Sequence, residues 1–307
     1  MSGELRQVVG VSLGSSARDH RVELELCGER FEVWREGCDN DWSRLKRRLI
    51  ELDHDSRVAA IGLGGVDLYL ESADRRYWFR EIKPLAKLVT SKPFVDGGGL
   101  KSAFEKSAVG FMQRELGADM STKTVLCTSG VDRWGLACGF EDAGAQVNYG
   151  DLLWALGIPC ILRSKKSFVR VAHALAPLAS KLPYSMLYDS NSDHTTEPKP
   201  NKAAMRAYRE ADIIAGDYKF VKQHMTERLD GKWVVTNTTT EKDVDFLRDK
   251  GIELMVTTTP RLEGRSFGTN VMEACLVAAA GSKTSLTADQ YVELAQTCGL
   301  TPSITYL

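Results

Sequence analysis

Short apolar runs alternate with amphipathic stretches along the chain, and this alternation predicts strands and helices in turn. The clearest unit lies near the middle. Residues 124–128 are a run of strand formers that Ser129-Gly130 interrupts, residues 134–140 have the apolar spacing of a helix on a sheet, and residues 145–149 form a second strand. This order predicts the βαβ unit that opens a Rossmann-like nucleotide-binding domain.

The same pattern extends to both sides of this unit. Before it, strands and helices are predicted at residues 8–13, 22–33, 42–52, 58–63, 85–89 and 93–96, and from residue 100 onward. After it, they are predicted at residues 168–182, 201–210, 211–215, 233–235, 254–256, 271–280 and 288–298. We therefore expect an α/β fold with an N-terminal α/β substrate domain at residues 1–118 and a Rossmann-like doubly wound domain at residues 119–284. A C-terminal helix at residues 285–307 would pack back on the first domain.

Composition narrows the classes of partner. The chain has 307 residues with 43% hydrophobic content, and its 40 basic and 41 acidic residues give a net charge of −1. This balance gives no electrostatic reason to expect nucleic acid or a membrane surface, and the longest apolar stretch, residues 152–162, is too short to span a bilayer. No signal segment precedes Val8. We expect a cytoplasmic protein with a small-molecule substrate, and a homo-oligomer is possible.

The cysteines and histidines are scattered. None of the seven cysteines forms a C-x-x-C pair, so we expect reduced core residues rather than disulfides or zinc ligands. The five histidines have no spacing that suggests a metal site or a catalytic triad. No metal is therefore expected.

The turn after the first strand of the central unit carries the strongest cofactor signal. Gly130 and Gly135 match the first and third glycines of the dinucleotide fingerprint, and Asp151 stands where the ribose acceptor belongs. Asp132 occupies the position of the second glycine and would repel a phosphate, although it could instead cap the helix and point away. Arg133 beside it is a further candidate. A cofactor with a ribose and a positive centre, such as S-adenosylmethionine, would avoid the repulsion.

Hydroxyl and carboxyl groups follow three later strands. Asp217, Thr238 and the pair Thr257-Thr258 come at predicted strand ends, where they could hydrogen-bond a ribose, a nicotinamide amide or a substrate hydroxyl. Threonine also favours strands and helix caps, so this reading has a structural alternative. We predict that these residues bind the cofactor.

Glycines and acids of the first half could bind the substrate. Gly98 and Gly99 precede a helix that begins near Lys101, so their N–H groups could hold an anion, unless the glycines form a mobile linker. Asp67 follows two glycines at a strand end, as a ligand-binding edge or as a tight turn. In the second half, Arg265 and Asn270 could hold a substrate or close the cleft between the domains.

The chain resembles a family of bacterial proteins described as quinate or shikimate 5-dehydrogenase-like. The matching stretches are VSLGSSARDHRVE, IGLGGVDLYL, FVDGGGLKSAFE, SGVDRWG, ADIIAGDYKF, TNTTTEKDV and TTTPRLEGRSFGTNVMEA. The resemblance implies an N-terminal substrate domain and a Rossmann domain with NAD or NADP. The Asn-Val-Thr-x-Pro-x-Lys motif of well-studied shikimate dehydrogenases is absent, so Lys83 and Lys101 are the candidate catalytic lysines, with Asp96 or Asp67 as partner. The glycine turn also resembles the Gly-Val-x-x-Trp-Gly turn of an S-adenosylmethionine-dependent pyridinol methyltransferase family of methanogens.

Three functional hypotheses follow. The first is an NAD(P)-dependent oxidoreductase that acts on a small hydroxylated and carboxylated substrate, with a lysine and an aspartate moving the alcohol proton. The second is an S-adenosylmethionine-dependent methyltransferase that uses the same crevice. The third is a non-catalytic sensor of a nucleotide-like ligand.

Overall fold

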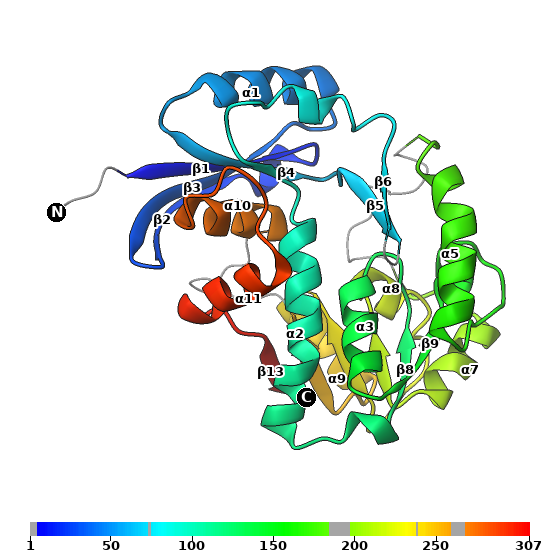
Figure 1. Cartoon of the computed structure of the whole chain (residues 1–307). Helices are drawn as coiled ribbons and strands as arrows, with labels where there is room; N and C mark the ends of the chain where they lie inside the picture. Colours follow the sequence, from blue (N-terminus) through cyan, green and yellow to red (C-terminus); the bar gives the residue numbers. More distant parts are fainter. Residues whose placement is uncertain (1–4, 73–74, 184–196, 238, 259–267) are drawn as a thin grey trace.

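The computed structural model describes residues 5–72, 75–183, 197–237, 239–258 and 268–307. They form an α/β fold with two separate main sheets, as the sequence predicts (Figure 1). The first sheet has the order β2-β3-β1-β4-β7, in which β2 is antiparallel to β3 and the other neighbours are parallel. Its strands are β1 (Arg6–Ser12), β2 (His20–Leu26), β3 (Glu29–Gly37), β4 (Val58–Gly64) and β7 (Phe94–Val95).

Alternation along β1 divides the first core between two faces. Val8 points to one face, where α10 (Thr269–Ala279) packs, and Val9 points to the other, where Leu45 and Leu49 of α1 (Trp42–His54) are fully buried. A parallel strand covered on both faces is apolar at nearly every position, which is why its sequence signal is strong. The first sheet thus lies between helices from opposite ends of the chain.

The second sheet is doubly wound. Its order is β13-β12-β11-β10-β8-β9, with only β13 antiparallel to its neighbour among the described strands. Its strands are β8 (Thr124–Cys127), β9 (Gln146–Tyr149), β10 (Ile213–Ala215), β11 (Trp233–Thr236), β12 (Leu254–Thr257) and β13 (Ser303–Tyr306). Because β9 and β10 flank β8 on opposite sides, the strand order reverses at β8, and this is where open α/β sheets bind ligands.

Helices cover both faces of the second sheet. One face is packed by α3 (Trp134–Asp142) and α5 (Lys165–Ala179). The other is packed by α4 (Asp151–Trp154), α7 (Lys202–Glu210), α8 (Tyr218–Gln223) and α9 (Glu241–Asp249). The predicted βαβ unit is therefore β8-α3-β9.

Helix α2 (Gly98–Leu116) joins the two sheets and packs on α3 and α11 (Ala288–Thr297) (Figure 1). The crossing with α3 is close because a Cβ on Gly135 would lie 2.5 Å from the Ser102 carbonyl oxygen, and one on Gly139 would lie 2.9 Å from Val109 Cγ2. Gly135 thus serves close packing, as the third fingerprint glycine does, but here against a helix rather than a strand.

Four features were not foreseen in detail. Residues 285–307 were expected to be a helix on the first domain, but they also contain β13, which pairs with β12 of the second sheet. A hairpin of β5 (Tyr69–Ser72) and β6 (Arg75–Trp78) projects from the first sheet toward α5 (Figure 1). Residues 85–89 contain a short 3₁₀ turn, Leu85–Lys87. Helix α10 lies inside the predicted 119–284 range, yet its buried side chains belong to the core of the first sheet. The domain boundaries themselves stay a prediction.

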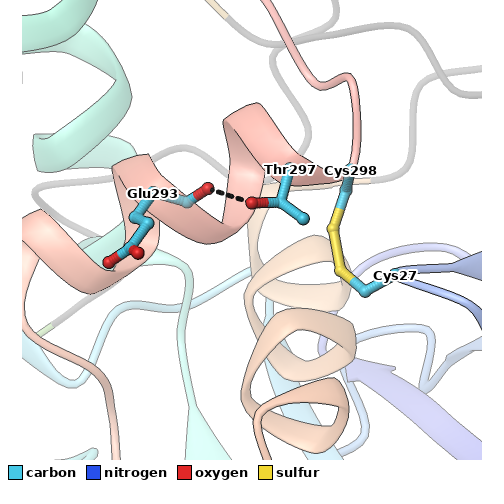
Figure 2. The surroundings of a disulfide bond; sticks show 4 residues. All are labelled: Cys27, Glu293, Thr297 and Cys298. Carbon is cyan, nitrogen blue, oxygen red and sulfur yellow. Dashed lines mark hydrogen bonds between the residues drawn. A yellow bond between two sulfur atoms is a disulfide. The ribbon is translucent and has the colours of Figure 1, made fainter.

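A disulfide corrects the expectation of seven reduced cysteines. Cys27, in the β2–β3 turn, is bonded to Cys298, at the end of α11, with Cα atoms 5.1 Å apart (Figure 2). Thr297 donates a hydrogen bond to the Glu293 carbonyl oxygen beside it. The two cysteines are 271 residues apart, so no local spacing in the sequence could predict the bond.

Among the described helices, none is long and apolar enough to cross a membrane.

Candidate functional site

A cavity of about 540 Å³ lies between the two sheets, where the start of α2 meets the turn after β8. Its walls come from the loop after β4, the β5–β6 hairpin, α2, the start of α3 and helix α10. The predicted site residues that line it are Asp67, Asp96, Gly98, Gly99, Lys101, Asp132, Arg133, Gly135 and Asp217. Residues distant in sequence therefore converge on one cavity.

Arg133 organises the ionic network on the second-sheet side. Its guanidinium is 9% exposed and lies 2.9 Å from Glu105 Oε1 and 2.5 Å from Asp217 Oδ2. Its Nε lies 3.1 Å from Asp132 Oδ2, and Lys101 Nζ lies 2.5 Å from Asp132 Oδ1. Burial would raise the pKa of Asp132, but the charges of Lys101 and Arg133 outweigh it and lower that pKa. Asp132 is therefore an ionised carboxylate, paired with Lys101 rather than pointing away.

Asp151 begins α4, and its carboxylate reaches into the turn between β8 and α3. Its Oδ2 accepts the Gly130 N–H at 2.9 Å and its Oδ1 accepts the Val131 N–H at 2.8 Å. A Cβ on Gly130 would lie 2.7 Å from Tyr149 Cδ1 and 3.1 Å from Asp151 Oδ2, so glycine permits this approach. Burial raises the pKa of Asp151 to about 6. The N–H groups that would hold a phosphate thus already hold a carboxylate.

A second cavity of about 190 Å³ adjoins the first at Leu70, Val131 and Asp132. It lies over the start of α4 and one face of α5, and most of its lining is apolar. The lining includes Leu152, Ala155, Leu156, Leu162, Phe168, Val171 and Leu175. Asp151, Thr128 and Ser129 provide its polar side. This cavity suits a ligand that carries a flat apolar ring and a ribose. The ring would pack on the apolar lining, and the Asp151 carboxylate would accept hydrogen bonds from the ribose hydroxyls.

The glycines before α2 do not offer the expected anion site. The Gly98 N–H donates to Asp96 Oδ1 at 3.0 Å, while Asp96 Oδ2 accepts the Leu68 N–H at 2.7 Å. Asp96 therefore holds two backbone segments together and is not the partner of Lys101. Burial raises the pKa of nearby Asp67 to about 7, with Asp96 contributing and Lys101 opposing. This wall of the cavity is acidic and does not suit an anion.

Five predicted site residues line neither cavity, and one of them, Gly130, lies in the turn that the Asp151 carboxylate contacts. Lys83 is exposed beside Trp78, so the structure does not support a catalytic role for it. Thr257 Oγ1 is 2.5 Å from Ser303 Oγ, and the Thr258 N–H donates to the Thr236 carbonyl, so both threonines serve the sheet. Asn270 packs against the first sheet, with its backbone oxygen 2.5 Å from the position of a Cβ on residue 62. Thr238 and Arg265 lie outside the described residues.

Sequence reasoning missed Glu105, Glu273 and Tyr291. Glu273 and Glu105 line the cavity, 1% and 2% exposed, and Tyr291 packs behind Glu273. Glu273 is the single charged residue in the stretch VMEACLVAAA, and an isolated charge in an apolar helix is a signal that could have found it.

Among the described residues, no group of three or more His, Cys, Asp or Glu side chains could hold a metal ion.

Fold and cavities define a two-domain α/β protein with a Rossmann-like second sheet and a cavity between its sheets. Residues 99–307 match the family model described as Domain of unknown function (DUF8754), and the chain belongs to this family. Residues 7–96 match Domain of unknown function (DUF8753). No curated protein matches the chain in sequence.

The solved structures that resemble the chain are distant. A solute-binding protein from Burkholderia multivorans is 12% identical with a TM-score of 0.41 over 99% of this chain and 100% of that one. A point mutant of glutamate dehydrogenase is also 12% identical, with a TM-score of 0.41 over 89% and 65%. A Trypanosoma brucei methylenetetrahydrofolate dehydrogenase-cyclohydrolase complexed with NADP is 11% identical, with a TM-score of 0.33 over 95% and 85%. Dehydrogenases and solute-binding proteins both occur among these distant structures, so the likeness decides no function.

Proposed function

We propose that this chain is an enzyme that binds S-adenosylmethionine across the two cavities and transfers its methyl group to a small polar acceptor in the larger one. The observation that carries the proposal is the pair of carboxylates at the β8–α3 turn. Asp151 already occupies the Gly130 and Val131 N–H groups, and Asp132 lies beside them. An adenosine-bearing cofactor without phosphates suits such a turn.

The charge inventory around the turn supports this choice. Two cations, Lys101 and Arg133, face three carboxylates of Asp132, Glu105 and Asp217. Two like charges 4 Å apart repel by about 4 kcal/mol at the effective dielectric of a protein surface, so a pyrophosphate is disfavoured. Burial raises the pKa of Glu105, whereas Lys101 and Arg133 keep the pKa of Asp132 low, so Asp132 is the carboxylate that would attract a sulfonium or ammonium group. The pyrophosphate of NAD does not fit the turn in its present arrangement.

Different residues of the two cavities would bind the cofactor and position the acceptor. The apolar lining near Phe168 would hold the adenine ring, and Asp151 would accept hydrogen bonds from the ribose hydroxyls. A bound cofactor would supply an electrophilic methyl carbon: the acceptor's lone pair would form the new bond to that carbon as the carbon–sulfur bond breaks, S-adenosylhomocysteine would leave, and any proton that the acceptor loses would pass to water. Methyl transfer depends chiefly on holding the acceptor in line with that carbon, and the shared boundary at Val131 lets the two ligands meet. Positioning by the cavity walls is therefore the main catalytic contribution of the protein.

An NAD(P)-dependent dehydrogenase is the second candidate. The observation that favours it is the Lys101–Asp132 pair in the large cavity, since a lysine beside a carboxylate could handle the proton of a substrate alcohol. Asp151 would have to leave the turn and bind the ribose of the dinucleotide. The quinate or shikimate dehydrogenase resemblance belongs to this candidate and stays a prediction.

Calorimetric titration of the ligand-free protein with S-adenosylmethionine, NAD and NADP separates the candidates. We expect micromolar binding of S-adenosylmethionine, weakened about tenfold or more by Asp151→Asn because a ribose acceptor is lost. Asp142→Asn is the matched control, since Asp142 is an exposed acid that pairs with Lys106 on the surface. Binding of NAD or NADP without S-adenosylmethionine would overturn the methyltransferase proposal.

The variant Asp132→Gly tests independently whether a cation or a phosphate binds at the β8–α3 turn. If a cationic cofactor lies there, removing the carboxylate weakens S-adenosylmethionine binding. If phosphates lie there, the same change strengthens NAD binding, because the repulsion disappears and Lys101 is freed. The two cofactors are thus expected to respond in opposite directions, and improved NAD binding alone would favour the dehydrogenase.

A further inference from the structure

Glu273 is a buried carboxyl group in the wall of the large cavity. It stands on α10, an otherwise uncharged helix, and is 1% exposed. Its Oε1 accepts a hydrogen bond from the Tyr291 phenol at 2.5 Å. Its Oε2 is buried without a hydrogen-bond partner among the described residues. A buried oxygen of this kind costs about 1–3 kcal/mol unless something bonds to it.

The surrounding structure holds this carboxyl group in one orientation. The Leu286 N–H donates to the Tyr291 oxygen at 3.1 Å, which leaves the phenol proton for Glu273. A Cβ on Gly99 would lie 2.7 Å from Glu273 Oε1 and 2.9 Å from Tyr291 Cε2, so a glycine is needed where α2 begins. Tyr291, itself held by Leu286, therefore fixes Oε1, and Gly99 leaves the space for this contact. Oε2 is the carboxyl oxygen without a hydrogen-bond partner among the described residues.

The charges that face Glu273 decide what kind of ligand it suits. Burial, with a smaller contribution from the Asp96 carboxylate, raises the pKa of Glu273 to about 7 against the opposing effects of the Tyr291 hydrogen bond, the Gly97 N–H and Arg76. Asp67 also lines the cavity, and the Asp96 carboxylate raises the pKa of both acids. Such a wall repels a carboxylate and favours a hydrogen-bond donor.

We propose that Glu273, oriented by Tyr291, is a substrate-binding residue that accepts a hydrogen bond from a hydroxyl or protonated amine of the substrate through Oε2. The inference rests on the proposed function only in taking the large cavity as the substrate site. It assigns the substrate to neutral or cationic compounds rich in hydrogen-bond donors. This replaces the hydroxylated carboxylic acid that the sequence led us to expect.

Calorimetry with three probes tests the assignment: myo-inositol as a neutral polyol, putrescine as a diamine, and quinate as an anionic hydroxy acid. At about pH 8 we expect millimolar or tighter binding of at least one donor probe and weaker binding of quinate. Glu273→Gln should weaken the donor probe about tenfold, and Tyr291→Phe should weaken it less, because Oε2 remains in place. Glu293→Gln removes an exposed acid from neighbouring α11 and should leave binding unchanged.

Several outcomes would overturn the assignment. The first is that Glu273→Gln binds the donor probe as tightly as the original chain does. The second is that the original chain prefers quinate, and the third is that neither donor probe binds in the millimolar range. Thermal unfolding of each variant shows whether it is folded. Titration of Glu273→Gln with S-adenosylmethionine keeps the two proposals apart: the cofactor should bind this variant as it binds the original chain. If the cofactor binds neither protein while the probes respond to Glu273, the proposed function fails and the substrate-binding residue stands.

Discussion

The carboxyl groups of the large cavity differ in protonation because different neighbours reach them. Lys101 and Arg133 contact Asp132 and hold its pKa low in spite of burial. For Asp67 and Glu273, burial outweighs the nearby cations and raises each pKa to about 7. The cavity wall of the second sheet thus carries fixed charge, while the opposite wall changes its charge near neutral pH.

This difference predicts a pH-dependent effect of Glu273→Gln on stability. The folded pKa of Glu273, about 7, lies above its ordinary value of 4.5, so its favourable contribution is present below that value and is lost as pH rises through 7. Glutamine does not titrate. Relative to the original chain, the variant should gain free energy of unfolding between about pH 5 and pH 8, by an amount on the order of 3 kcal/mol.

Thermal unfolding at a series of pH values checks this expectation. Glu293→Gln serves as the comparison because Glu293 is exposed on α11. A difference between Glu273→Gln and the original chain that does not vary with pH would show that the carboxyl group is not forced to ionise in an unfavourable environment.

At the scale of elements, the crossing of α2 and α3 sets the distance between the two sides of the site. Lys101 and Glu105 stand on α2, whereas Asp132 and Arg133 precede α3, so the ion pairs form only if the two helices lie close together. Gly135 allows this proximity. The glycine that the sequence assigns to the cofactor therefore acts on the site through helix packing.

Gly135→Ala should destabilise the protein by about 1–3 kcal/mol, because its Cβ would meet the Ser102 backbone, which cannot rotate away as a side chain could. Gly110→Ala on α2 is the control. A Cβ there would meet only Arg114 Nη1, at 3.6 Å, and alanine favours a helix by up to about 1 kcal/mol over glycine. Denaturant unfolding measures both changes, and equal effects would contradict close packing at Gly135.

Most elements could be predicted from the sequence because their signals are local. The apolar run at 124–128, the break at Ser129-Gly130 and the helical spacing at 134–140 produce β8, its turn and α3. The β5–β6 hairpin was missed because residues 71–76 are mostly polar and lack the usual two-residue turn signal. Thr257 and Thr258 line neither cavity, and the Thr257 hydroxyl bonds Ser303 within the sheet, since threonine serves a sheet as readily as a ligand.

At the scale of the whole molecule, the site is built by contacts that no local pattern encodes. Glu273 reaches the cavity, and Tyr291 reaches Glu273, because α10 and α11 return to the first sheet and to α2. The pairing of Lys101 with Asp132 instead of Asp96 is also set by this arrangement. The sequence therefore supplied many residues of the cavity, but the pairs among them required the tertiary structure.

The disulfide is a feature of the same scale. By the chain-entropy model, closing a loop of 271 residues lowers the entropy of the unfolded state and stabilises the fold by about 6 kcal/mol, as an upper value. Cys298→Ser, or a reductant acting on the original chain, should lower the melting temperature by up to about 10 °C. Cys160→Ser is the control, because Cys160 is an exposed free cysteine. An unchanged melting temperature under reductant would show that the bond does not stabilise the fold.

The bond between Cys27 and Cys298 also turns most of the polypeptide into a covalent ring, with β1 on one tail and β13 on the other. A protease that cuts the ring once opens it without separating the pieces. The nicked protein would therefore run as one species on a gel without reductant and as two with it. Each fragment would contribute strands to the sheets, so the sheets would hold the fragments together. A single cleavage would then leave the ligand sites assembled, although N-terminal sequencing would detect a second chain end.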